Sequence, residues 1–209
     1  MDDKTKIIGL TGGIGTGKST AAEYLKARGF KQIDADAISR SLTADGSPML
    51  DILNDEFGPS GPFGKAGYEI LNEDGSLNRQ ATADLVFRDE ARKKRFDEIM
   101  ITEIVRIIDG DIAAYRKDNA GDLVLLDAPL LFEAGLDARC DAVLLIVADK
   151  DVRIDRVCQR DGISRQQVQD RIDNQMSDEE KISRSDFVVD NSEDLEHLYR
   201  QLDEFVERL

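Results

Sequence analysis

Residues 12–19, with the sequence GGIGTGKS, match the pattern G-x-x-x-x-G-K-[ST] and constrain the fold more than any other feature of the chain. They stand between an apolar stretch that predicts a strand, residues 6–10, and a helical pattern over residues 18–28. Such a loop turns backbone amides inward around a polyphosphate, and the helix that follows adds positive potential. Lys18 then supplies a charge for the outer phosphates, and Ser19 a hydroxyl ligand for Mg²⁺. The alternative, a glycine-rich turn with Lys18 in solvent, is disfavoured by the intact motif in this context, so the segment predicts nucleotide binding.

Apolar runs with β-branched residues predict a sheet of five short strands. Three of the runs (IIGL, LVLL and AVLLIV) are continuously hydrophobic, which is typical of parallel strands covered on both faces. Helical patterns alternate with the strands, so we expect an α/β fold, a doubly wound parallel five-stranded sheet like that of P-loop kinases. The expected strands are residues 6–10, 31–33, 123–126, 141–147 and 187–189, and the expected helices include 18–28, 37–42, 149–160 and 193–209.

Two stretches do not fit a simple alternation of strand and helix. The stretch between the second and third strands is too long for a crossover, and we interpret residues 45–120 as a helical acceptor-binding insert with a long helix over 89–115. Residues 150–184 are crowded with Arg, Asp and Gln, which favours a polar helical hairpin that acts as a lid. The whole chain, 1–209, is then one P-loop kinase domain with its core at residues 1–44, 121–149 and 185–209.

Composition and charge exclude several classes of partner and site. The net charge of −15 works against nonspecific DNA or RNA binding. The longest apolar stretch, residues 142–148, is far shorter than the roughly 20 residues that cross a bilayer. Cys140 and Cys158 form no CxxC pattern, and His197 is the only histidine, which excludes a disulfide framework and a His/Cys zinc site. We expect a cytoplasmic monomer or small homo-oligomer that binds small molecules, with no nucleic-acid or membrane partner.

The remaining motifs separate the classes of P-loop protein. A guanine-reading N-K-x-D motif is absent, and Asp127-Ala128-Pro129-Leu130 stands where a GTPase carries D-x-x-G. Motor ATPases are usually larger. A compact P-loop domain with a helical insert and an arginine-rich late segment is typical of a small-molecule kinase, which closes a lid over ATP.

Two carboxylates follow the second predicted strand, in the string Ile33-Asp34-Ala35-Asp36. The carboxyl ends of parallel strands line the ligand crevice, so one of these groups can accept the proton of an attacking hydroxyl. Their spacing points them in different directions, and we favour Asp36. Either residue could instead cap the helix expected at 37–42. Arg40, one turn after Asp36, reaches the same region or forms only a surface ion pair.

Asp127 ends the third predicted strand in a Walker-B-like position. It could hold Mg²⁺ directly or through water, or it could be an ordinary strand-end turn residue. Arginines in the lid segment are suited to stabilising the charge of a transferred phosphoryl group, although most arginines in such a run are simply solvated. The candidate arginines of this segment are Arg153, Arg156, Arg160, Arg165 and Arg171.

Taken together, the motifs of the chain resemble those of the dephospho-CoA kinase family, in the same order and over nearly the whole length. The joint occurrence of LTGGIG-x-GKS, DAD and PLLFE is far more specific than the phosphate loop alone. The strings that carry the resemblance are Ile8–Ser19, Ile33–Asp36 with Arg40, Pro129–Glu133, Gln159–Asp161, Arg171 with Gln175-Met176, and Asp186–Asn191.

This resemblance implies phosphorylation of the ribose 3′-hydroxyl of dephospho-CoA by ATP with Mg²⁺, giving CoA and ADP. It makes Asp36 the general base, and Lys18 and Arg160 the cations on the moving phosphoryl group. Ser19 and Asp127 become the candidate metal ligands. The residues expected to hold ATP are Gly13, Ile14, Gly15, Thr16, Gly17, Lys18, Ser19, Thr20, Arg171 and Asn191, and those expected near the acceptor are Asp34, Arg40 and Glu133. Glu133 could equally be a helix-start acid on a short turn.

The chain departs from the family pattern at two places. Ile99-Met100-Ile101-Thr102 stands where the long helix of the insert usually carries a His-Pro pair, and the loop over residues 59–73 is expanded. Both changes fall in the expected acceptor-binding insert, so they bear on acceptor affinity more than on ATP binding. Two other functions therefore stay open: a P-loop kinase for another alcohol, nucleoside or nucleotide, and a nucleotide-binding regulatory protein without transferase activity.

Overall fold

The computed structural model describes residues 4–118 and 121–209. The chain divides into two compact units, one formed by residues 1–34 and 111–209 and the other by residues 35–110. The assignment of residues 45–120 to an acceptor-binding insert and of 150–184 to a lid stays a prediction. No helix among the described residues combines the length and the apolar character needed to cross a membrane.

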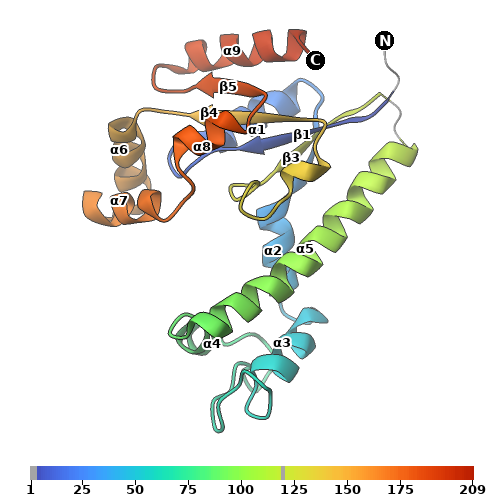
Figure 1. Cartoon of the computed structure of the whole chain (residues 1–209), viewed down its shortest axis with the longest axis vertical. Helices are drawn as coiled ribbons and strands as arrows, with labels where there is room; N and C mark the ends of the chain where they lie inside the picture. The colour runs from blue at the N-terminus through green and yellow to red at the C-terminus, as the bar shows by residue number, and fades with distance from the viewer. Residues whose placement is uncertain (1–3, 119–120) are drawn as a thin grey trace. The chain divides into compact units, whose positions relative to one another are not determined.

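The first unit is built on a parallel sheet of five strands in the order β2-β3-β1-β4-β5 (Figure 1). This confirms the predicted fold class. β1 is central, with β3 and β4 as its neighbours, and it leads directly into the phosphate loop. Four of the five strands end one residue beyond the expected run, because the ladders extend to the pairs Thr11–Leu145, Asp34–Asp127 and Val147–Asp190. The bounds are β1 Lys6–Thr11, β2 Lys31–Asp34, β3 Leu123–Asp127, β4 Ala142–Val147 and β5 Phe187–Asp190.

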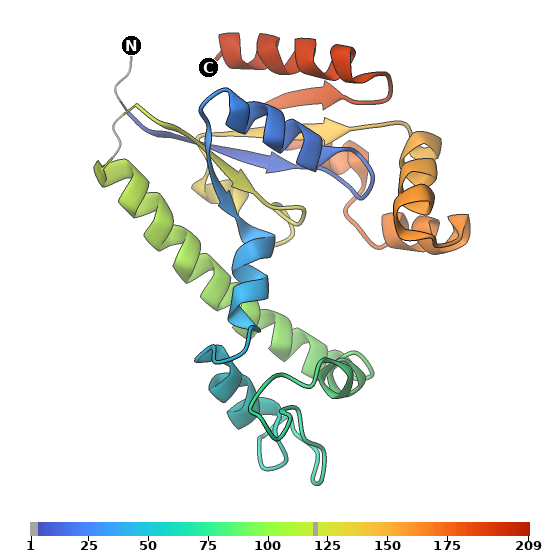
Figure 2. The same ribbon diagram turned by 180° about the vertical axis from the view of Figure 1, so that it is seen from behind.

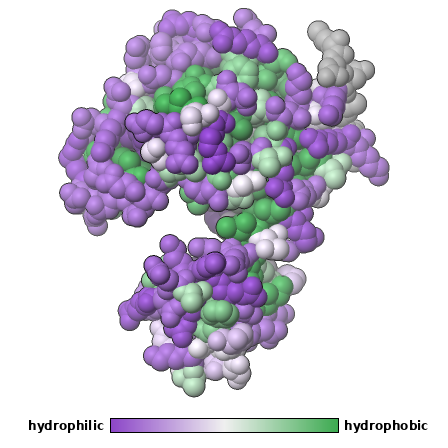
Figure 3. Space-filling view, in the orientation of Figure 1, coloured by the Kyte–Doolittle hydropathy of each residue, from purple (hydrophilic) through white to green (hydrophobic). Residues whose placement is uncertain are grey.

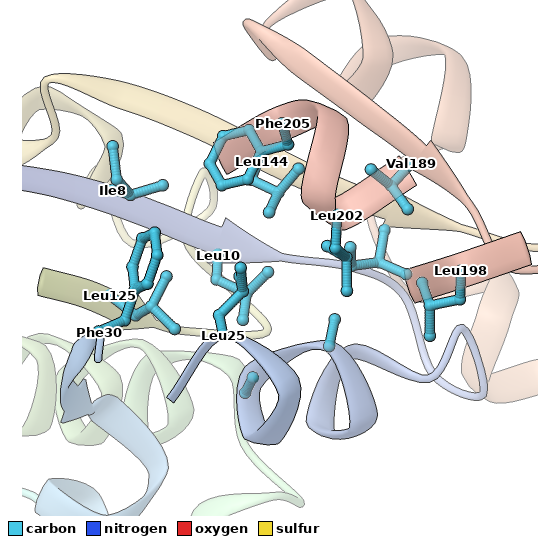
Figure 4. Packing of buried hydrophobic residues seen from close by; sticks show 13 residues of the cluster. Ile8, Leu10, Leu25, Phe30, Leu125, Leu144, Val189, Leu198, Leu202 and Phe205 are labelled. Carbon is cyan, nitrogen blue, oxygen red and sulfur yellow. The ribbon is translucent and has the colours of Figure 1, made fainter. Parts of the chain in front are cut away.

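Two amphipathic helices cover one face of this sheet. α1 (Lys18–Ala27) and α9 (Leu195–Glu207) pack their apolar sides on the strands, and Figure 4 shows Leu25, Leu198 and Leu202 gathered over β1 and β4. The spacing of the buried residues of α9 matches the helical period, so a single stripe faces the core. α8 (Asp178–Ser183) lies on the opposite face of the sheet (Figures 1 and 2).

The segment 150–184 is helical, as its composition indicates. It forms α6 (Lys150–Asp161), α7 (Arg165–Asp173) and α8, and its surface over α6 and α7 is mainly hydrophilic (Figure 3). Ser164 begins α7 with a capping box. The segment is not wholly polar, because Ile154, Val157 and Val168 form a small buried cluster that the phosphate-loop residue Ile14 joins.

The second unit has its own core. The helices α2 (Ala35–Leu42), α3 (Met49–Phe57), α4 (Arg79–Val86) and the first part of α5 (Glu90–Asp118) surround Leu53, Phe57 and Met100. The expanded loop over residues 59–73 contributes Phe63, Tyr68, Ile70 and Leu71 to this core, and Ile70 is fully buried. The loop over residues 59–73 therefore packs on the core of the unit and does not only meet solvent.

Candidate active site at the phosphate loop

The loop between β1 and α1 has the backbone of a phosphate cradle. Gly15 and Gly17 adopt φ angles of 80° and 86°, which residues with a side chain rarely adopt. The hydroxyl of Thr16 donates to the Gly13 carbonyl over 2.9 Å and closes the turn. α1 begins at Lys18, so its unpaired amides and the positive end of its dipole face the loop.

A residue from another part of the chain, Asn191, packs against the phosphate loop at Gly17. Asn191, which follows β5 and is buried, donates its side-chain amide to the Thr16 carbonyl over 2.7 Å and leaves no room for a Cβ at Gly17. The Oδ1 atom of Asn191 and the Nη1 atom of Arg156 are buried beside this glycine and have no hydrogen-bond partner among the residues that the structure describes. Such unpaired polar atoms fit a site that receives a polar ligand or an ordered water. Asn191 thus shapes the loop through Thr16, and its predicted contact with the nucleotide base stays a prediction.

Replacing Gly17 by alanine tests this packing. We expect a loss of unfolding free energy of more than about 2 kcal/mol and at least a tenfold loss of ATP affinity, because strain at positive φ adds to a collision with Asn191. Gly29→Ala is the matched control: its φ is 95°, but nothing lies within 4 Å of the new Cβ. Chemical denaturation and calorimetric ATP binding should give about 1 kcal/mol and unchanged affinity for the control. Equal losses in the two variants would contradict the proposed packing role of Asn191.

Lys18 and Asp127 form a buried ion pair at the mouth of the loop. Their side chains are 14% and 8% exposed, and the Lys18 ammonium donates to Asp127 Oδ1. Gln32 donates to the other oxygen of Asp127 over 2.9 Å. Burial raises the pKa of Asp127; the Lys18 charge opposes that rise, whereas the charge of Asp34 adds to it. Lys18 is therefore held in place by the residue predicted to bind the metal.

The residues at this mouth fit Mg²⁺ bound mainly through substrate phosphates. Ser19 is exposed at the start of α1, and Asp127 offers one nearby carboxylate. No group of three or more His, Cys, Asp or Glu in the described parts of the chain could hold a metal unaided. Mg²⁺ commonly takes one or two protein oxygens and completes its shell with phosphate and water, so this sparse donor set suits it.

The carboxylates after β2 lie in different compact units. Asp34 ends β2 opposite Asp127 in the register of the sheet. Asp36 lies in the first turn of α2 and Arg40 in its last turn, both exposed. The helix begins at Ala35, two residues earlier than the sequence indicates, so Asp36 is inside it and not its cap. Their roles as base and acceptor contact stay predictions.

The two lid arginines converge on one carboxylate. Arg160 holds Asp161 with both ends of its guanidinium, over 2.7 and 3.1 Å, and Arg171 reaches the same Asp161 over 3.4 Å. The Arg160 guanidinium holds the pKa of Asp161 below its usual range. Both arginines are more than half exposed, so they are free to exchange this partner for a phosphate.

Glu133 lies on a turn, as one of the two predictions has it, and its carboxylate contacts the segment 150–184. Its carboxylate accepts from the Met176 amide over 3.4 Å and lies 3.5 Å from the ammonium of Lys181, which is fully buried. A buried ammonium without an opposite charge is costly, so Glu133 stabilises α8 in its place. Its predicted contact with the acceptor stays a prediction.

Sequence reasoning missed the residues that hold the loop from the lid side. Arg153 and Gln175 contact the backbone of Ile14 through its carbonyl and its amide, over 2.9 and 3.0 Å. In the sequence, Gln175 belongs to the string Gln175-Met176, which carries the family resemblance but indicates no function. Arg153 is one of the five candidate arginines of residues 150–184. Their signal is weak because both contacts join residues far apart in the sequence.

Comparison with known proteins agrees with this geometry. The sequence profile of the dephospho-CoA kinase family matches residues 6–197. A dephospho-CoA kinase of Corynebacterium glutamicum is 38% identical over 191 residues, covering 91% of this chain and 93% of that protein. One from Fusobacterium nucleatum is 31% identical over 203 residues, covering 97% and 98%.

Solved structures share the fold over the same length. The dephospho-CoA kinase from Campylobacter jejuni has a TM-score of 0.69 at 25% identity, covering 97% of this chain and 96% of that one. The structure of TT1252 from Thermus thermophilus has a TM-score of 0.77 at 34% identity, covering 99% and 98%. With a phosphate loop of this build, and with relatives matched along nearly their whole length, the chain belongs to the dephospho-CoA kinase family.

Proposed function

We propose that this kinase transfers the γ-phosphoryl group of ATP to the ribose 3′-hydroxyl of dephospho-CoA, giving CoA and ADP. The observation that carries the proposal is the phosphate loop with Lys18 held at its mouth by Asp127, in a chain of this family. The pair places a cation where the outer phosphates would lie, and the loop amides complete a positive cradle.

In the proposed step, Asp36 accepts the proton of the 3′-hydroxyl as its oxygen attacks the γ-phosphorus. The new O–P bond forms while the bond from the γ-phosphorus to the bridging oxygen breaks, and ADP leaves with that electron pair. Asp36 is exposed in the first turn of α2, so an acceptor hydroxyl can approach its carboxylate from solvent. Asp34 and Arg40 flank it in sequence and are proposed to contact the acceptor, as is Glu133.

Cations stabilise the charge on the transferred group. Lys18 exchanges Asp127 for the phosphates. Arg160 and Arg171 exchange Asp161 for them when the lid closes, since both arginines are exposed where they pair with Asp161. Ser19 and Asp127 would hold Mg²⁺, which neutralises charge on the β- and γ-phosphates when bound. We also propose a cytoplasmic location, because the free thiols of Cys140 and Cys158 suit a reducing compartment.

The test compares acceptors directly. Purified protein is incubated with ATP, Mg²⁺ and dephospho-CoA, and in parallel with adenosine, CMP or no acceptor, while ADP release and product mass are followed. We expect a mass gain of one phosphate on dephospho-CoA alone. That result would also show that Ile101 and Thr102 are compatible with acceptor binding. Phosphorylation of another acceptor instead would contradict the assignment, and ATP binding without any product would indicate a regulatory protein.

A further inference from the structure

Arg153 is the most deeply buried charged side chain at the phosphate loop. It belongs to α6, is 2% exposed, and lies where α6 runs beside the loop (Figures 1 and 2). Its Nε donates to the Ile14 carbonyl over 2.9 Å, and its guanidinium occupies the space that a Cβ at Gly13 would need. Its own backbone packs equally closely on Gly15. Arg153 therefore packs against three successive loop residues, Gly13 to Gly15.

The same guanidinium reaches the end of the lid segment. Its Nη1 donates to Asp178 over 2.6 Å, and Asp178 is the first residue of α8. Gln175, three residues earlier, accepts the amide hydrogen of Ile14 over 3.0 Å. The peptide groups on both sides of Ile14 are thus bonded to side chains of the lid segment, and its side chain joins the apolar cluster of α6 and α7.

This arrangement is a poor way to gain stability alone. Burying a guanidinium costs desolvation energy, and an apolar side chain of similar volume often stabilises a protein as well as a buried ion pair does. Only a planar group with several donors, however, can bond a loop carbonyl and a carboxylate in fixed directions at once. A buried charge at Arg153 is better explained by the conformation that its directed hydrogen bonds impose on the phosphate loop.

We propose that Arg153 is a positioning residue: it holds Gly13–Gly15 against α6 and, through Asp178, fixes this part of the loop to the start of α8. The loop amides then keep the spacing that the triphosphate requires. The proposal rests on ATP as the nucleotide of the proposed function. It assigns no contact between Arg153 and the substrates.

The experiment uses the full chain and three single variants. Arg153→Met removes the charge and keeps the volume. Asp178→Asn removes only the partner charge, at a side chain that is 38% exposed, and so tests the same link if Arg153→Met does not fold. Arg165→Met is the matched control, because Arg165 lies in the same segment, is 55% exposed and pairs with Asp151 and Asp155 away from the loop. For each, we would measure the melting temperature, the Kd of ADP by calorimetry, and KM for both substrates.

For Arg153→Met we expect the Kd of ADP and the KM of ATP to rise about 10- to 100-fold, with KM for dephospho-CoA within about twofold of wild type. Asp178→Asn should shift the same two constants in the same direction by a smaller factor, and Arg165→Met should shift neither. Folded variants at Arg153 and Asp178 with lower melting temperatures but unchanged ADP affinity would overturn the proposal, leaving a structural role. ADP affinity does not involve the acceptor, so this result stays decisive even if the wild type fails to phosphorylate dephospho-CoA.

Discussion

An Asp36→Asn variant is expected to lose about 10²–10⁴-fold in kcat, the range that a general base contributes. Asparagine keeps the shape of the side chain but cannot accept the proton of the attacking hydroxyl. ATP affinity should change by less than about twofold, because the phosphates are held by the loop and Lys18. Steady-state kinetics with dephospho-CoA, together with calorimetric ATP binding, measure both quantities.

Two further variants make this prediction specific. Asp34→Asn tests the neighbouring carboxylate, which ends β2 opposite Asp127 and belongs to the sheet. Asp55→Asn, on the exposed side of α3, controls for the loss of one negative charge in the same compact unit as Asp36. We expect Asp55→Asn to keep wild-type turnover. If Asp34→Asn lost turnover while Asp36→Asn retained it, the base would be Asp34 and the assignment made here would be wrong.

The parts of the fold that follow from local pattern were predictable. Short apolar runs place each strand within about one residue, and three of them are continuous because buried parallel strands need apolar side chains on both faces. The phosphate loop is equally local: glycines at positive φ and the lysine that begins α1 are adjacent in the chain. The start of α7 is local in the same way, because Ser164 and its capping partner Gln167 are three residues apart.

What could not be predicted depends on contacts between distant residues. Glu133 lies on a turn, which was one of its two expected settings, but nothing local in the sequence indicates that its carboxylate meets the buried ammonium of Lys181. A lysine in a polar, charged segment gives no sign that it is fully buried. Arg153 presents the same difficulty, because its neighbours Arg156 and Arg160 look alike in sequence and differ only in what the fold places beside them. Tertiary packing therefore decides which arginine of residues 150–184 is buried against the phosphate loop and which is exposed.

Replacing Lys18 by methionine is expected to affect catalysis and stability together. Loss of the cation at the outer phosphates should lower kcat/KM for ATP by at least about 10²–10³-fold, as when one preorganised donor is removed. The same change leaves the Asp127 carboxylate, 8% exposed, without its cation, which for a buried pair costs about 3–5 kcal/mol of unfolding free energy. Kinetics and chemical denaturation at pH 7 measure the two losses separately.

The pH dependence and a double variant show whether the stability loss comes from Asp127. Burial raises the pKa of this carboxyl above its unfolded value, and without Lys18 nothing of equal strength opposes that rise. The folded variant then binds a proton more readily than the unfolded chain, so its stability should increase as the pH falls through the folded pKa toward the unfolded one, and be lost as the pH rises through the folded pKa. Lys18→Met combined with Asp127→Asn removes the unpaired charge and should recover most of the stability at pH 7. It should recover none of the turnover, because the proposed cation and metal ligand are both absent. Recovery of turnover in the double variant would show that the unpaired Asp127 carboxylate, rather than the missing Lys18 charge, caused the loss in Lys18→Met, and would contradict the role proposed for Lys18.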